Sequence, residues 1–198
     1  MLKLARAAQT TQSLLKKYSL DSFVSAGVTP DSITRGVYSS GSPTTNVIQY
    51  ITIATLGNAT DFGDATISTW SKCGLASETR GVVSGGWLSQ NVMDYITILT
   101  TGNATDFGDL AVGVSGTPAT CSSLTRGCIA GGTSAGNNRS NVIQYITIAT
   151  LGDATDFGDL TAARSDLAGV NDSSRGVFGG GYAGSVSNVI DYITIGNT

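Results

Sequence analysis

The sequence contains no histidine among its 198 residues. Histidine is the usual general base of Ser-His-Asp and Cys-His catalysis and the commonest nitrogen ligand of zinc and copper. Its absence excludes those catalytic arrangements and those metal sites. We therefore expect a chain with no catalytic residue, no bound metal and no cofactor.

Cysteine is also scarce, with three residues at Cys73, Cys121 and Cys128. The number is odd and no pair has CxxC spacing, which argues against both a disulfide framework and a zinc site. An unpaired cysteine behaves as a small apolar side chain. We expect all three to be buried free thiols.

Charged residues are few, and the sequence has no long apolar run. Only 13% of residues are charged, and the formal net charge is −3. A nucleic-acid partner would need a basic surface, so none is expected. No apolar run approaches the roughly 20 residues that span a membrane, and the N-terminus lacks the apolar core of a signal peptide. We expect no membrane insertion.

The few basic residues are unevenly placed. Residues 1–20 contain no acid and four cations, Lys3, Arg6, Lys16 and Lys17. The stretch LKLARAAQTTQSLLKKY predicts a basic amphipathic helix, because its apolar residues recur along one side. Residues 1–20 would then dock an acidic neighbour or cap the domain that follows. The alternative is that Leu14–Leu20 forms a strand.

Glycine, in contrast, is abundant, with 26 residues. Together with many Ile, Val, Thr and Tyr residues it predicts short strands joined by tight turns. One string occurs three times, as GNATDFGDA from Gly57, GNATDFGDL from Gly102 and GDATDFGDL from Gly152. The similarity around each copy extends over a unit of about 45 to 50 residues.

Each unit carries two further landmarks. An Arg-Gly pair recurs at Arg35, Arg80, Arg126 and Arg175, and a tyrosine strand recurs around Tyr50, Tyr95, Tyr145 and Tyr192. This period occurs in β-propeller blades and in helical repeats, and the β-rich composition favours the blades. The segment Asn46–Thr55 is apolar on both faces, as expected for a sheet stacked between neighbouring sheets.

These features predict an all-β fold, in which residues 21–198 form a β-propeller-like array of four blades. Each blade is expected to have a strand before the Arg-Gly turn (FVSAGV, KCGLAS, TCSSL or DLAGVN) and a glycine-rich strand after it. The tyrosine strand, a corner at DFGD and an outer strand (DATIS, DLAVG or DLTAA) follow. The sequence stops soon after the fourth tyrosine strand, so we expect the last blade to be incomplete.

The repeat resembles two known patterns. The strand order is similar to that of kelch blades, although no tryptophan regularly marks the outer strand and the corner reads DFGD. The strings NVIQYITIATLGNATDFGDA and SSRGVFGGG resemble a repeat of virion structural proteins of tailed bacteriophages, particularly those of marine and cyanobacterial hosts. This resemblance covers about residues 22–198 and implies a component of the phage particle, such as a tail-fibre protein.

Two aspartates recur in every DFGD string, at Asp61, Asp64, Asp106, Asp109, Asp156 and Asp159. A calcium loop would supply five or more oxygens, which two carboxylates per unit do not. A glycosidase also uses paired carboxylates, but an active site is normally made once rather than in every unit.

We therefore interpret these aspartates as structural groups that cap backbone N–H groups of the corner. The phenylalanines between them, Phe62, Phe107 and Phe157, would fill the space between adjacent sheets. The four repeated arginines are expected to occupy equivalent positions and to pair with an aspartate or with carbonyl groups of the corner.

The loops between the glycine strand and the tyrosine strand vary, and contain SPTT, WLSQ, TSAGNNRS and YAGSVS. Exposed aromatic and arginine side chains contribute much of the energy of protein contacts. The candidate binding residues in these loops are Trp87, Asn137, Asn138, Arg139 and Tyr182. The alternative is that the loops vary because nothing constrains them.

The sequence thus predicts a non-enzymatic virion structural protein, displayed on the tail or capsid surface. Its expected partners are other virion proteins and a glycan or protein of the host cell surface. The open strand edge of the last blade predicts a homo-oligomer. The alternatives are a glycan-processing depolymerase and an intracellular kelch-like scaffold.

Overall fold

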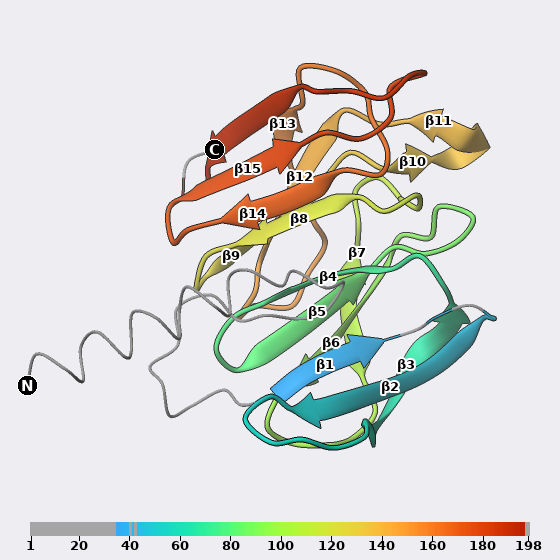
Figure 1. Cartoon of the computed structure of the whole chain (residues 1–198), viewed down its shortest axis with the longest axis vertical. Helices are drawn as coiled ribbons and strands as arrows, with labels where there is room; N and C mark the ends of the chain where they lie inside the picture. The colour runs from blue at the N-terminus through green and yellow to red at the C-terminus, as the bar shows by residue number, and fades with distance from the viewer. Residues whose placement is uncertain (1–34, 40, 42, 197–198) are drawn as a thin grey trace, which may run out of the picture.

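The computed structural model describes residues 35–39, 41 and 43–196, and this part of the chain is all-β. Its sixteen strands form four antiparallel sheets and one two-stranded hairpin. The sheets follow one another in chain order, so that the first and the fourth lie at opposite ends of the molecule (Figure 1). No helix among the described residues is long and apolar enough to cross a membrane.

The sheets, numbered here in chain order, consist of the following strands. Sheet 1 contains β1 (Arg35–Ser39), β2 (Thr45–Thr52) and β3 (Thr60–Thr69), and sheet 2 contains β4 (Cys73–Ala76), β5 (Arg80–Ser84), β6 (Val92–Thr97) and β7 (Thr105–Asp109). Sheet 3 contains β8 (Ala119–Ser122), β9 (Arg126–Ala130), β12 (Val142–Thr147) and β13 (Thr155–Asp159). Sheet 4 contains β14 (Ala168–Asn171), β15 (Arg175–Gly179) and β16 (Ile190–Thr194). The hairpin between β9 and β12 consists of β10 (Thr133–Ser134) and β11 (Asn138–Arg139), joined by a 3-10 turn at Ala135–Asn137.

The predicted repeat is present in the strand order. Sheets 2 and 3 each place four strands side by side in chain order, and the strand expected before Arg-Gly is found in sheets 2, 3 and 4. Sheet 4 contains three strands among the described residues, β14, β15 and β16. The strand FVSAGV and the helix expected within residues 1–20 lie outside the described residues.

Two local expectations were wrong. Arg-Gly is not a turn, because the arginine is the first residue of the glycine-rich strand in all four sheets. DFGD is not a corner, because the whole string lies inside the outer strand. The strand expected after DFGD exists in sheet 1, where β3 continues to Thr69, but β7 ends at Asp109 and β13 ends at Asp159.

A β-bulge at the glycine explains the error. Gly63, Gly108 and Gly158 have φ values of 142°, 135° and 139°, which side chains rarely adopt. The pairing between the tyrosine strand and the DFGD strand shifts register beside each of them. A glycine between two aspartates is typical of a turn, but here it bends a strand without ending it.

The hydrophobic core lies between successive sheets and is divided into three clusters. The first cluster joins Val37, Ile48 and Phe62 of sheet 1 to Val83 and Ile96 of sheet 2. Corresponding clusters join sheet 2 to sheet 3 and sheet 3 to sheet 4. Each DFGD phenylalanine packs in one cluster and meets the tyrosine of its own sheet edge-on, at 6.0, 6.2 and 6.0 Å between ring centroids. The expected role of these phenylalanines is confirmed.

The outer strands of successive sheets are joined by backbone hydrogen bonds that involve both halves of the repeated string. Gly102 N–H donates to the Phe62 carbonyl at 2.7 Å, and Ala104 N–H donates to the Asp64 carbonyl at 2.8 Å. In return, Asp64 N–H donates to Asn103 Oδ1 at 3.0 Å. The GNA turn of sheet 2 therefore lies on the DFGD strand of sheet 1.

The same three bonds recur between sheets 2 and 3. Gly152 and Ala154 donate to the carbonyl groups of Phe107 and Asp109 at 2.9 and 2.8 Å. Asp109 N–H donates to Asp153 Oδ1 at 2.9 Å, so the Asn-to-Asp difference between copies keeps an oxygen acceptor in place. We call this set of contacts the outer-strand junction.

Alanine substitutions at two equivalent glycines should separate the free-energy cost of disturbing the junction from the cost of the backbone conformation. A Cβ at Gly108 would lie 2.6 Å from the carbonyl carbon of Gly152, whereas a Cβ at Gly158 would have no atom within 4 Å. Gly158→Ala should cost about 1–3 kcal/mol for the unfavourable φ alone. Gly108→Ala should cost at least about 1 kcal/mol more, because the two sheets must move apart. Urea unfolding of both variants tests this, and equal losses would show that the close approach does not matter.

Candidate functional site

The variable loops of sheets 2, 3 and 4 lie in residues 85–91, 131–141 and 180–189, each between the second and third strands of its sheet. Each loop bonds to the segment that enters its own sheet or the next one. Gly86 N–H donates to the Val114 carbonyl at 3.0 Å, and Gly132 N–H donates to the Arg164 carbonyl at 2.9 Å. We call these loops and the entering segments 70–72, 111–118 and 161–167 the loop end. The arginines lie at the opposite ends of their strands.

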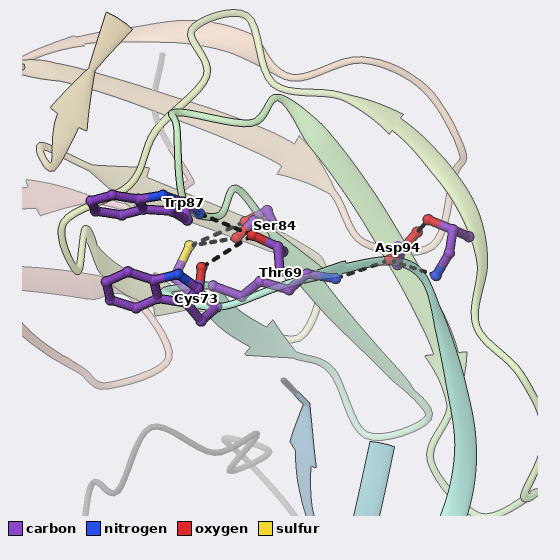
Figure 2. A network of polar contacts seen from close by, with 8 residues as sticks. Thr69, Cys73, Ser84, Trp87 and Asp94 are labelled. Atoms are coloured by element: carbon purple, nitrogen blue, oxygen red, sulfur yellow. Dashed lines mark hydrogen bonds and ion pairs between the residues drawn. The ribbon is translucent and has the colours of Figure 1, made fainter. Parts of the chain in front are cut away.

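Trp87 stacks on Trp70 at the loop end, and sequence reasoning missed Trp70. The ring centroids are 4.5 Å apart with an interplanar angle of 19°, and Trp87 is 46% exposed. The Trp87 amide donates to Thr69 Oγ1 at 3.1 Å and to the Trp70 carbonyl at 2.8 Å (Figure 2). The backbone bonds hold the two residues side by side, and the stacked rings form a partly exposed aromatic surface.

Two other candidate binding residues meet across different loops. The Arg139 guanidinium lies 4.4 Å from the centroid of the Tyr182 ring. Arg139 belongs to the β10–β11 hairpin, whereas Tyr182, in the loop of sheet 4, is bridged to Ser165 in the entering segment and to Val186 in the same loop. Asn138 uses its side chain to donate to the Ala135 carbonyl at 3.2 Å, and Asn137 adopts a φ of 59° in the hairpin turn. Both asparagines shape the hairpin.

Backbone strain is concentrated at the loop end. Among the described residues, six non-glycine residues have positive φ, and all six lie in these loops and entering segments: Ser71, Leu88, Ser89, Thr117, Asn137 and Asp166. Leu88 and Ser89 directly follow Trp87. Such conformations cost of order 1–3 kcal/mol each and persist where the surrounding structure imposes them, often at binding sites. The loop end is therefore strained as well as variable.

The four repeated arginines have equivalent positions, as expected, but not the expected partners. Each guanidinium lies over the tyrosine ring of its own sheet, at 4.4 Å for Arg35, 4.5 Å for Arg80, 4.3 Å for Arg126 and 4.9 Å for Arg175. Three of them also donate to a carbonyl of the next sheet, in the pairs Arg35–Ile98 (3.1 Å), Arg80–Ile148 (2.9 Å) and Arg126–Ile195 (3.0 Å). We call each of these pairs an arginine clamp.

The strand register explains the correction. Arg80 lies opposite Thr97 in the neighbouring strand, which places Tyr95 diagonally beside it on the same face. The aspartates are one strand further away, and all six of them, Asp61, Asp64, Asp106, Asp109, Asp156 and Asp159, are exposed.

The aspartates of DFGD do act as caps in two of the three copies. Asp106 Oδ1 accepts a hydrogen bond from Gly108 N–H, and Asp156 Oδ1 accepts one from Gly158 N–H, both at 3.3 Å. The described residues contain no group of three or more Cys, Asp or Glu residues placed to hold a metal ion. The arrangement gives these carboxylates a backbone role.

Two buried ion pairs escaped the sequence reasoning. The residue before the repeated tyrosine is Asp94 in sheet 2, and it contacts Lys72 Nζ at 3.3 Å and Thr66 Oγ1 at 2.5 Å. Figure 2 shows the contacts of Asp94, and the Lys72 and Asp94 side chains are 3% and 0% exposed. Burial lowers the pKa of Lys72, and the Asp94 carboxylate opposes that shift. The equivalent Asp191 of sheet 4 pairs with Arg164 and accepts from Thr161 Oγ1 at 2.7 Å.

Sheet 3 has a neutral group at the same position. Gln144 accepts from Val112 N–H at 3.2 Å and donates to the Val112 carbonyl at 2.9 Å. In sheets 2 and 4, where an aspartate precedes the tyrosine, the segment that enters the sheet contains a basic residue. In sheet 3, where a glutamine precedes the tyrosine, no basic residue is needed. This covariation between copies was the available sequence signal for Lys72 and Arg164.

All three cysteines are free thiols, as expected, but only two of them are buried as well. Cys121 and Cys128 are buried, and Cys73 is half-buried. Burial raises the pKa of Cys73 to about 11. Cys121 lies opposite Cys128 in neighbouring strands, and their hydrogen bond together with burial raises the pKa of Cys121. The same contact lowers the pKa of Cys128, but that thiol is fully buried, so the structure does not favour cysteine chemistry.

Comparison with known proteins gives a likeness of fold. No protein-family model and no curated protein matches the chain. The solved structure of YjhT is similar, with a TM-score of 0.72 and 10% sequence identity. The match covers 88% of this chain and 61% of that chain, so this chain spans less than two thirds of the length of YjhT.

Replacing Lys72 should test the buried ion pair. Lys72→Met leaves Asp94 buried without its cation and should lower the free energy of unfolding by about 3–5 kcal/mol. The double variant Lys72→Met/Asp94→Asn places an uncharged amide at this position, as Gln144 does in sheet 3. It should recover most of that loss. Equilibrium unfolding of both variants measures the difference. If the double variant is no more stable than Lys72→Met, the unpaired charge is not the cause.

Proposed function

We propose that this protein is a non-enzymatic structural protein of a tailed-bacteriophage virion. In this proposal the four sheets are consecutive kelch-like blades of a β-propeller-like array on the tail or capsid surface. The loop end binds neighbouring virion proteins or a glycan or protein of the host surface. The long strings that resemble phage virion repeats support the setting, and the likeness to YjhT concerns the fold alone.

One observation carries the proposal of a binding rather than a catalytic role. The repeated polar groups make contacts within the framework: the arginines clamp successive sheets, and Asp106 and Asp156 bond to their own bulges. The residues that differ between repeats, including Trp87, Arg139 and Tyr182, gather instead at the loop end. A scaffold that repeats its framework and varies one end is suited to recognition.

The exposed aromatic groups at the loop end fit such a role. Trp87 is 46% exposed and Tyr182 is 41% exposed. Both are held in place, Trp87 by its stacking on Trp70 and Tyr182 by its contact with Arg139. Aromatic and arginine side chains held in this way lose little conformational entropy on binding. A depolymerase would instead need a non-repeated pair of carboxylates, and no observation on the described residues favours that alternative.

Mass spectrometry of purified virions tests the proposed setting. The protein should co-purify with particles through a density gradient at a constant ratio to the major capsid protein. Intact particles should also bind antibodies raised against the hairpin Thr133–Ser140. A protein found only in the soluble fraction of infected cells would contradict the virion assignment and favour a scaffold inside the cell.

Replacing the hairpin tests the loop end. Exchanging Thr133–Ser140 for a Gly-Ser linker should lower host adsorption or incorporation into particles by about tenfold or more, because it removes the Arg139–Tyr182 contact and the projecting surface. The unfolding midpoint should change little, since the hairpin contributes no residue to the core clusters. Leu124→Ser, in the exposed turn between β8 and β9, is the control. Unchanged adsorption and incorporation would show that the binding surface lies elsewhere.

A further inference from the structure

Sheet 4 presents an apolar face away from sheet 3. Val170 lies opposite Val177, and Val177 lies opposite Tyr192, so the three side chains share one face. Ile190, two residues before Tyr192, lies on the same face. Val170, Ile190 and Tyr192 are 59%, 70% and 67% exposed.

The same face is buried in the preceding sheets. The equivalents of Val170 are Leu75 in sheet 2 and Cys121 in sheet 3, which are 4% and 2% exposed. The equivalents of Ile190 are Met93 and Ile143, which are 0% and 2% exposed. In every internal case the covering layer is the next sheet, with Ile146 and Ile148 of sheet 3 covering sheet 2.

Sheet 1 has the same apolar layer that covers the preceding sheet elsewhere in the molecule, but on sheet 1 this layer is partly exposed. The residue three positions after the repeated tyrosine is Ile98, Ile148 or Ile195 in sheets 2, 3 and 4, and these are 2%, 0% and 0% exposed. Its equivalent in sheet 1 is Ile53, which is 43% exposed. Val47 of β2 lies six residues earlier, on the same side of the pleat, and is 39% exposed.

Sheets 4 and 1 also each contain one half of an arginine clamp, the arginine in sheet 4 and the carbonyl acceptor in sheet 1. Arg35, Arg80 and Arg126 each donate to the carbonyl of that isoleucine in the next sheet. Arg175 keeps its tyrosine contact and is exposed, and no clamp to a carbonyl is recorded for it within the described structure. The Ile53 carbonyl is the equivalent acceptor, and it lies on the sheet at the other end of the molecule (Figure 1).

We propose that sheet 4 of one copy docks on sheet 1 of a second copy, and that this junction repeats the internal one. Val170, Ile190 and Tyr192 of one copy would pack against Val47 and Ile53 of the next. Arg175 would donate to the Ile53 carbonyl of that copy. The contact is head-to-tail, so it builds a closed ring or an open row of copies.

The junction between copies is weaker than the internal ones. It contains the apolar layer and the arginine clamp but no outer-strand junction, because sheet 4 has no DFGD strand among the described residues. Association therefore depends on protein concentration. The inference deepens the assembly role proposed above and rests on it only for the biological setting.

Sedimentation velocity of the full chain over a range of concentrations tests the proposal. The unmodified chain should assemble as concentration rises. Val170→Asp and Ile53→Lys should each weaken assembly by about tenfold or more, because each places a charge in the apolar layer. Both positions are exposed in a single copy, so circular dichroism and thermal unfolding should show an unchanged fold. Leu124→Asp, at a position 49% exposed outside both faces, is the matched control and should assemble like the unmodified chain.

Mixing the two variants tests the head-to-tail geometry. The Val170→Asp chain retains an intact sheet 1 face, and the Ile53→Lys chain retains an intact sheet 4 face. An equimolar mixture should therefore form a one-to-one dimer at concentrations where each variant alone stays monomeric. A contact between two sheet 4 faces would instead leave Ile53→Lys dimeric on its own, and that result would overturn the proposal.

Two further outcomes would also overturn it. An unmodified chain that stays monomeric at all concentrations would mean that another occupant, such as residues 1–34 of the same chain, covers the face. Assembly that Val170→Asp does not change would mean that copies meet elsewhere. These results are independent of the virion assignment, which fails only if the protein is absent from purified particles.

Discussion

The contact on which the rest of the structure depends is the outer-strand junction, where the GNA turn of one sheet lies on the DFGD strand of the sheet before it. The bulge glycine allows this contact, because a side chain at Gly63 would come within 2.4 Å of the Gly102 carbonyl oxygen. Three hydrogen bonds then join backbone to backbone and to one side-chain oxygen. The repeated nine residues thus contain both a turn that docks on the preceding sheet and a strand that accepts the following one.

This junction sets the spacing at which the other contacts between sheets can form. The isoleucine and valine layers fill the space between sheets, the arginine clamps connect the opposite strand ends, and the residue before the tyrosine reaches the segment that enters its sheet. Aspartate with a cation and glutamine with a backbone amide both satisfy that position, as Asp94 and Gln144 show. With the framework held by repeated contacts, Trp87, Arg139 and Tyr182 are free to differ from one sheet to the next.

The sequence predicted the parts of the fold that depend on side-chain pattern. The recurring tyrosines, arginines and phenylalanines revealed the repeat, the strand order and the packing of Phe62, Phe107 and Phe157 between sheets. It did not reveal the bulge, because Asp-Phe-Gly-Asp has the local composition of a turn. The acceptors of the arginine clamps are main-chain carbonyl groups, which no residue type marks. Trp70 was missed because it has no counterpart in other repeats and meets Trp87 only after β4 and β5 have folded back.

Native-state hydrogen exchange, followed by NMR at a concentration where the chain is a monomer, tests the outer-strand junction most directly. The Ala104 and Ala154 amides bond to the preceding sheet, whereas Ala59, at the same place in the first copy of the string, is exposed and has no preceding sheet among the described residues. Ala104 and Ala154 should therefore exchange as slowly as the amides of the central strands, and Ala59 should exchange quickly. Equal protection of all three would mean that the repeated string stabilises each sheet by itself, and would contradict the account.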